Sequence, residues 1–595
     1  MIVYGDHPIE IEPADFVAGL KRRFAGAPAN IDEARVRLVL AGQLQQAVED
    51  AGLDWAPQSR CLTDLASDVF VGTMLRTSGQ GQQANAIARQ LDLLTRSIPS
   101  HSPPLQVRTP EGFAWYALYP DAYAQAADRW ARAARTPDRV LVIGVRSIGT
   151  TLAGVVAAVL RVRGLWVRAF TVRPRGHPFQ RSTTLPADLP HADCAIVVDE
   201  GPGLSGSSMA SVAEALIGRG LSRHAVTLFP GHGHGPGPEA SEAVRRCWAN
   251  APQMTVGWGE LSLDGHAAPI AVEGIAQSAL QEPLEPLQDV GAGRWRTLLS
   301  EPFGDAHAIA PFLEQPKLLA RGCSKAGLLV KFAGFALFSV SQAGCLIASA
   351  EAHASRLEEL ARAGWTVPPL ANSQGWVGTA WVDGRQVRAL DADAECLLRL
   401  GTYIRAVAGP PAGKQGEKAA ARVRNILVSN TRELLGEAAA DRAERASDAL
   451  ASAIIGRDVP TYGDGRMAPH EWLWSGADLL KLDAAGHQND HLAVGAQPIW
   501  WDIAGVSMEW ALSEAARDEV ARVAGVEGGA AEATYFRAAY AALRAGIARL
   551  GIDRAAHDPG DRQAFQRALQ HYGCCLDSEL LRLETHCAPR ARRPG

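Results

Sequence analysis

Between residues 139 and 216, short β-branched runs alternate with stretches of helix-spaced apolar residues. Three runs predict strands, at residues 139–145, 165–172 and 195–198. Apolar residues recur every three or four positions after the first run and again from Met209, which predicts helices. This alternation is typical of a parallel sheet with helices on both faces. Ligands of such sheets bind beyond the strand ends, so we expect chemistry in the loops that follow the three strands.

The regions on either side have a different pattern. The spacing of apolar residues in 31–51 is typical of a helical N-terminal region, which a Pro/Ser-rich break at 98–104 ends. The last three hundred residues contain strand-like runs at 327–332 and 376–383 around a helical stretch. We therefore expect a multidomain α/β and α+β protein. Its predicted parts are a mainly helical region (1–108), a parallel-sheet domain (109–260), a connecting segment (261–290), a second domain (291–588) and a disordered tail (589–595).

The loop after the third strand has the pattern of a sugar-phosphate site. Asp199 and Glu200 follow the strand directly, and a Gly/Pro turn leads to a serine-rich segment, 205–208, at the start of the next helix. Carboxylates accept hydrogen bonds from vicinal hydroxyls, and free N–H groups at a helix start bind phosphate. The first two strands are also followed by polar loops, at 146–151 and 173–178. The three loops together favour a phosphorylated sugar as ligand.

Residues 110 to 255 resemble the type I phosphoribosyltransferases, whose Rossmann-like domain binds phosphoribosyl pyrophosphate (PRPP). The resemblance implies that Asp199 and Glu200 bind the ribose and serve catalysis, and that Mg²⁺ neutralises the leaving diphosphate. It implies PRPP-binding residues in all three loops: Gly144, Arg146, Ser147, Arg173, Arg175, Ser205, Gly206, Ser207 and Ser208. The family's first acid lies five residues before the phosphate turn, whereas Asp199 lies six before Ser205 (205 − 199) and Glu200 five. Either the turn has one extra residue, or Glu200 is the first acid and the second is missing.

The C-terminal region resembles the aminoglycoside-phosphotransferase branch of the bilobal protein-kinase-like fold. The resemblance implies nucleotide binding by Lys331, acceptor orientation by the catalytic Asp483, and metal binding by Asn489 and Asp502, with ATP and Mg²⁺ as cofactors. The sequence departs from the family in three ways. Lys481 stands where the family has His, Asp483 lies six residues before Asn489 (489 − 483) rather than five, and no clear Gly-rich loop precedes Lys331. An alternative interpretation makes a metal site of His487, Asp490 and His491.

Composition excludes several other classes of function. A net charge of −5 gives no electrostatic case for a nucleic-acid or membrane partner. Nine cysteines without a CxxC pair favour a reducing cytoplasm. The N-terminus has no signal-peptide pattern, and the longest apolar stretch, 328–340, is too short to span a bilayer. The expected partners are therefore small molecules: PRPP, its acceptor and ATP.

The sequence predicts a phosphoribosyltransferase that modifies a small molecule, with an ATP-dependent small-molecule kinase activity in its C-terminal domain. Two alternatives stay open. One is a non-catalytic sensor that binds a phosphoribosyl compound, and the other is a chain in which only the kinase-like half is active.

Overall fold

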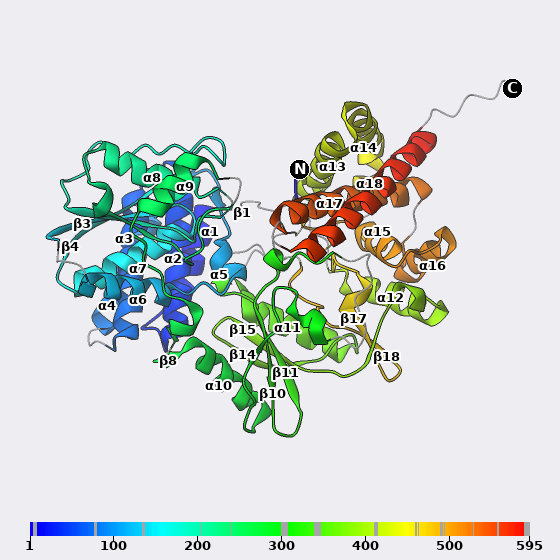
Figure 1. The fold of residues 1–595 in the computed structure, drawn as a ribbon, viewed down its shortest axis with the longest axis horizontal. Helices are drawn as coiled ribbons and strands as arrows, with labels where there is room; N and C mark the ends of the chain where they lie inside the picture. Colours follow the sequence, from blue (N-terminus) through cyan, green and yellow to red (C-terminus); the bar gives the residue numbers. More distant parts are fainter. Residues whose placement is uncertain are drawn as a thin grey trace.

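The computed structural model describes most of the chain: residues 1–3, 9–76, 80–133, 137–203, 205–237, 240–263, 265–298, 308–337, 347–409, 414–457, 461, 463–487, 492, 494–526, 529–555 and 558–587. The part coloured blue to green contains a parallel sheet and its helices, and the part coloured green to red contains a second sheet and a group of helices (Figure 1). The predicted tail, 589–595, lies outside the described residues. Among the helices that are described, none is long and apolar enough to cross a membrane.

The first sheet is parallel throughout, in the order β4-β3-β5-β6. Its strands are β3 (Arg139–Val145), β4 (Trp166–Val172), β5 (Cys194–Val198) and β6 (Val226–Phe229). The helices α7 (Ile148–Val162) and α8 (Ser207–Gly218) follow β3 and β5. These bounds confirm the three predicted strands and both predicted helices.

Both faces of this sheet are covered, because alternate residues of each strand point to opposite sides. Val140 and Val142 of β3 belong to the core cluster that contains α7, whereas Leu141 and Ile143 belong to the cluster that contains α8. The prediction of a parallel sheet between helices is therefore confirmed.

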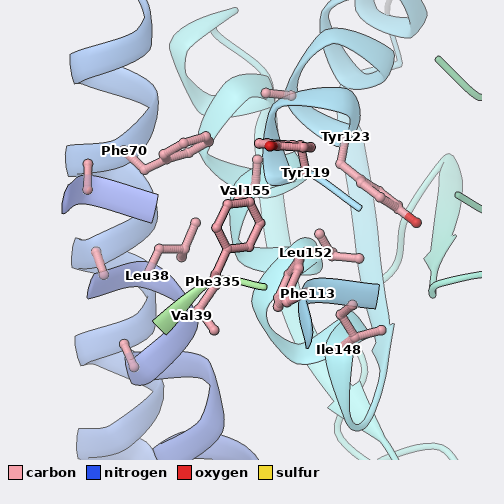
Figure 2. Close-up of a cluster of buried hydrophobic side chains, with 14 of the residues drawn as sticks. Leu38, Val39, Phe70, Phe113, Tyr119, Tyr123, Ile148, Leu152, Val155 and Phe335 are labelled. Carbon is pink, nitrogen blue, oxygen red and sulfur yellow. The ribbon is translucent and has the colours of Figure 1, made fainter. Parts of the chain in front are cut away.

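The N-terminal helices pack against α7 and share its core. They are α1 (Pro13–Arg23), α2 (Ile31–Ala51), α3 (Ala56–Met74) and α4 (Gln80–Ser97). The Asn30 side chain accepts a hydrogen bond from the Glu33 N–H at the start of α2, and Gly52, with φ of 65°, ends this helix. Figure 2 shows Leu38 and Phe70 from these helices facing Val155 of α7. A short strand pair, β1 (Ile9–Ile11) with β2 (Leu105–Val107), joins the two ends of this region.

The second sheet is antiparallel, in the order β14-β15-β11-β10-β9. Its strands are β9 (Gln288–Asp289), β10 (Lys317–Arg321), β11 (Gly327–Phe332), β14 (Pro369–Ser373) and β15 (Trp376–Ala380), and α11 (Ser349–Arg362) packs on β14 and β15. Tyr119, just before α6 (Pro120–Ala133), connects this sheet to the first part of the chain. Its hydroxyl donates to the Gln374 carbonyl (2.6 Å) and accepts from Trp376 Nε1 (2.9 Å).

A group of helices and a three-stranded sheet complete the C-terminal part (Figure 1). The strands are β16 (Arg385–Gln386), β17 (Trp472–Ser475) and β18 (Asp478–Lys481). The helices are α12 (Ala394–Val407), α13 (Lys414–Leu435), α14 (Glu437–Arg457), α15 (Trp500–Glu509), α16 (Glu514–Ala524), α17 (Ala530–Arg554) and α18 (Pro559–Cys587). Smaller connecting elements are α5 (Glu111–Trp115), α9 (Glu242–Asn250), α10 (Ala268–Leu280), β7 (Ser262–Leu263), β8 (His266–Ala267), β12 (Ala336–Leu337) and β13 (Ile347–Ala348). The chain is thus a mixed α/β protein.

Candidate functional site

The antiparallel sheet and the β17–β18 hairpin meet at an ion pair. Lys331 lies on β11, and its Nζ donates to Asp483 Oδ1 over 2.7 Å, although the two residues are 152 positions apart. Lys317, its neighbour on β10, has its Nζ 3.9 Å from Asp483 Oδ2. Burial acts to raise the pKa of Asp483, but the charge of Lys331 holds that pKa well below its usual value. Asp483 is therefore ionised beside two ammonium groups.

A tight loop before β17 presents a second carboxylate, Asp464, which is 6% exposed. Asp502, in the first turn of α15, accepts the backbone N–H groups of Asp464 (2.9 Å) and Gly465 (2.7 Å) on its two carboxylate oxygens. A Cβ at Gly463 would lie 2.2 Å from Asp502 Oδ2, so only glycine allows this close approach. Burial raises the pKa of Asp502 to about 6. Asp502 therefore fixes the backbone of the loop that carries Asp464.

His487 lies between the two carboxylates, Asp464 and Asp483. Its Nδ1 is 2.9 Å from Asp464 Oδ1, and its Nε2 is 3.7 Å from Asp483 Oδ2. The residue is 7% exposed, and Nε2 has no hydrogen-bond partner among the described residues. Burial opposes protonation, but the charges of Asp464 and Asp483 raise the pKa of His487. His487 also lines a cavity, and its Nε2 is a buried atom beside Asp483.

Asp464, Glu471 and His487 also have the spacing of a cation site, with ligand atoms within 4.8 Å of one another. A lysine already neutralises this cluster. The fully buried Lys481 donates to Glu471 Oε2 (2.7 Å) and lies 3.5 Å from Asp464 Oδ2. Burial acts to raise the pKa of Asp464, but Lys481 and His487 lower it to about 2. The ammonium group of Lys481 therefore supplies positive charge to these two carboxylates.

The structure brings together Lys331 and Asp483 among the residues predicted for the C-terminal region. Asp502 lies behind the Asp464 loop, with both oxygens bonded to backbone N–H groups. Asn489, Asp490 and His491 lie outside the described residues. Sequence reasoning missed Asp464 and Glu471. A Gly-Asp-Gly segment ahead of two short strand-like runs was the available signal.

In the parallel sheet, Asp199 and Glu200 lie at the carboxyl end of β5, where the sequence placed them. The Asp199 carbonyl accepts from Tyr123 Oη (2.7 Å), and Glu200 Oε2 accepts from the Gly112 N–H (3.1 Å). Burial raises the pKa of each carboxyl to about 7. The two acids therefore share an environment that disfavours their charged forms.

The serines at the start of α8 already contact another loop of the chain. The hydroxyls of Ser205 (2.7 Å) and Ser207 (2.5 Å) donate to the Pro178 carbonyl. Gly206, with φ of +62°, is so close to Trp248 and Pro236 that a Cβ would lie 2.7 Å from each. Ser208 is the second residue of α8, and it is partly exposed. A phosphate at this turn would have to displace the Pro178 carbonyl from both hydroxyls.

The predicted diphosphate-binding loops contact α2. Arg146 pairs with Glu49 (3.1 Å) and Asp50 (3.2 Å), and Arg173 also pairs with Asp50. A Cβ at Gly144 would lie 2.2 Å from the Gly149 carbonyl, so this glycine keeps the turn into α7 closed. Ser147 is the residue before α7 and makes no side-chain cap, whereas Arg175 is exposed. The structure therefore brings the two arginines together with acids from the N-terminal helices.

No protein-family model and no curated protein match the chain. Solved structures similar to it include a choline/ethanolamine kinase family protein from Mesorhizobium loti, with 15% identity over 45% of this chain and 90% of that one and a TM-score of 0.32. A choline kinase from Streptococcus pneumoniae has 12% identity over 51% of this chain and 99% of its own, with a TM-score of 0.33. A putative aminoglycoside phosphotransferase from Ralstonia eutropha has 12% identity over 52% of this chain and 98% of its own, with a TM-score of 0.31. Sequence identities and TM-scores this low do not assign the chain to a family.

Proposed function

We propose that the C-terminal part is an ATP-dependent phosphotransferase that acts on a hydroxyl group of a small molecule. The contact between Lys331 and Asp483 carries this proposal. Protein kinases place a strand lysine on the nucleotide phosphates and a metal-binding aspartate nearby, with a loop carboxylate that receives the acceptor proton. Here a strand lysine, a carboxylate two residues after β18 and an earlier loop carboxylate meet at one place.

Lys331 and Lys317 are suited to bind the phosphates of the nucleotide. Their ammonium groups both approach Asp483, so they lie side by side at the end of the sheet. Burial lowers the pKa of Lys331, while the Asp483 charge opposes this effect. A desolvated ammonium group forms short, charge-assisted and therefore strong hydrogen bonds with phosphate oxygens.

Asp483 is the carboxylate that fits Mg²⁺ in this site. It is ionised, and its side chain is 25% exposed, whereas Asp464 and Asp502 are buried and bonded within the protein. Mg²⁺ is commonly held by one or two carboxylates together with substrate phosphates. When bound, the ion would neutralise charge that develops on the transferring phosphoryl group. This assignment gives Asp483 the metal-binding role and leaves Asp502 as a positioning residue.

His487 is suited to receive the proton of the acceptor hydroxyl. Asp464 holds its Nδ1 (2.9 Å), which leaves Nε2 as the base, as in other Asp–His pairs. The acceptor oxygen forms a bond to the γ-phosphorus, the bond from that phosphorus to the bridging oxygen breaks, and ADP leaves with the electron pair. The hydroxyl proton passes to His487 Nε2. Asp464 orients the imidazole and stabilises its positive charge.

Binding of a fluorescent ATP analogue tests the proposal without knowledge of the acceptor. Lys331→Met removes a charge-assisted contact with phosphate and is expected to weaken binding at least about tenfold. Lys325→Met is the matched control, because Lys325 lies in the exposed turn between β10 and β11. Melting temperatures of both variants show whether they fold. Equal affinity of the wild type and Lys331→Met would refute the assignment.

The parallel sheet carries a second proposal, that it binds PRPP and transfers its phosphoribosyl group. The position of Asp199 and Glu200 at the carboxyl end of β5, before α8, favours it. Binding would require Arg173 to exchange Asp50 for the diphosphate, and Ser205 to release Pro178. Calorimetric titration with PRPP and Mg²⁺ tests this. Saturable binding that Asp199→Asn abolishes supports the proposal, and absence of binding refutes it.

A further inference from the structure

A cavity opens beside the Asp464–His487 pair and extends to α17. Its walls include Arg466, His487, Trp501, Tyr540, Leu543 and Arg544. Trp501 and Tyr540 lie edge to face with ring centroids 5.7 Å apart and supply an apolar wall. Among the described residues that line the cavity, none is an aspartate or glutamate, whereas two are arginines. The charged groups of this wall are therefore cationic.

Arg544 is held in place from behind. Its Nε lies 3.1 Å from Glu509 Oε1 and 3.3 Å from Tyr572 Oη. Glu509 Oε1 also accepts the hydroxyls of Tyr540 (2.7 Å) and Tyr572 (2.9 Å), which fixes its position in the core. Both contacts of Arg544, with Glu509 and with Tyr572, are made through its Nε within the described residues. The Arg544 side chain is 22% exposed. The two terminal nitrogens are therefore left as a pre-oriented pair of donors.

We propose that the phosphoryl acceptor is an anionic hydroxyl compound whose carboxylate or phosphate binds Arg544, with its hydroxyl at His487 Nε2. This inference rests on the proposed phosphotransferase function and names its substrate class. Guanidinium groups bind two oxygens of a carboxylate or phosphate through parallel hydrogen bonds. A cationic amino alcohol would instead place its ammonium group beside the guanidinium groups of Arg466 and Arg544, where the aromatic rings are the part of the described lining that could attract it.

Calorimetric binding of four probes to the full chain tests the substrate class. The anionic probes are glycerate, which carries a carboxylate, and glycerol 3-phosphate; the cationic probes are choline and ethanolamine. We expect at least one anionic probe to bind more tightly than both cations, and the tighter of the two anions identifies the group that Arg544 binds. Tighter binding of choline or ethanolamine, or no binding of either anion, overturns the inference.

Substitutions on α17 test the role of Arg544 itself. Arg544→Gln is expected to weaken anion binding at least tenfold, and Arg544→Lys to retain part of it. Arg549→Gln, on the same helix with a side chain that is 59% exposed, is the matched control and should bind as the wild type does. Unchanged affinity in Arg544→Gln overturns the inference. Binding of the ATP analogue is measured in parallel, so that loss of the nucleotide site, which would refute the proposed function, is read separately.

Discussion

Replacement of Asp199 by asparagine should stabilise the protein at alkaline pH. The new side-chain amide would keep an oxygen for the Glu200 N–H, which Asp199 Oδ1 accepts over 2.9 Å, but it would carry no charge. Burial raises the pKa of Asp199 to about 7 from an ordinary value of 3.8. A folded-state pKa above the unfolded one means that the stabilising contribution is present at low pH and is lost as pH rises through about 7.

The size of the effect follows from the pKa shift. Roughly three pKa units at about 1.4 kcal/mol each give a ceiling near 4 kcal/mol. Because the carboxyl is partly exposed at the sheet edge, water reduces this penalty, and about 2 kcal/mol is a reasonable expectation. Asp199→Asn should therefore match the wild type near pH 4 and exceed its unfolding free energy by about 2 kcal/mol at pH 8.

Urea denaturation, followed by circular dichroism at several pH values, measures this difference. Asp188→Asn is the matched control, because Asp188 is an exposed carboxyl near the same sheet. A difference between Asp199→Asn and the wild type that stays constant from pH 4 to pH 8 would refute the reasoning. Destabilisation by Asp199→Asn at pH 8 would refute it as well, since it would mean that the folded state favours the carboxylate.

Two further predictions concern the loop and base of the proposed phosphotransferase site. His487→Gln should lower kcat about a hundredfold or more and leave the affinity for the ATP analogue unchanged. An unchanged kcat would contradict the role of His487 as the base. The control is His224→Gln, at an exposed histidine. Gly463→Ala should lower the unfolding free energy by about 1–3 kcal/mol, because its Cβ would displace Asp502. Gly573→Ala, where a Cβ meets nothing within 4 Å, should be neutral or stabilising, and equal effects of the two alanines on the melting temperature would contradict this account.

Local pattern predicted the elements well where a periodic run was long enough. The strand at 139–145 and the helix at 31–51 have the predicted bounds, because burial on a sheet or helix face imposes the period on each sequence. The helix after Ser205 also begins where the small-residue turn ends. The division of the chain into domains stays a prediction.

The candidate site was harder to predict because its contacts are non-local. Asp464 lies 38 residues before Asp502, whose side chain fixes the Asp464 loop. The two strands in that interval, β17 and β18, have only four residues each. The pairing of Arg146 and Arg173 with Glu49 and Asp50 likewise depends on how α2 packs on the sheet. No spacing within one loop carries information of this kind.

Calorimetric titration of the full chain with a non-hydrolysable ATP analogue, with Mg²⁺ and with chelator, tests the Lys331–Asp483 site most directly. The wild type should bind the analogue more tightly with Mg²⁺, and Asp483→Asn should lose that dependence on the ion. If the wild type binds equally well in both conditions, or if Asp483→Asn retains the full Mg²⁺ effect, then Asp483 does not hold the metal of a nucleotide site.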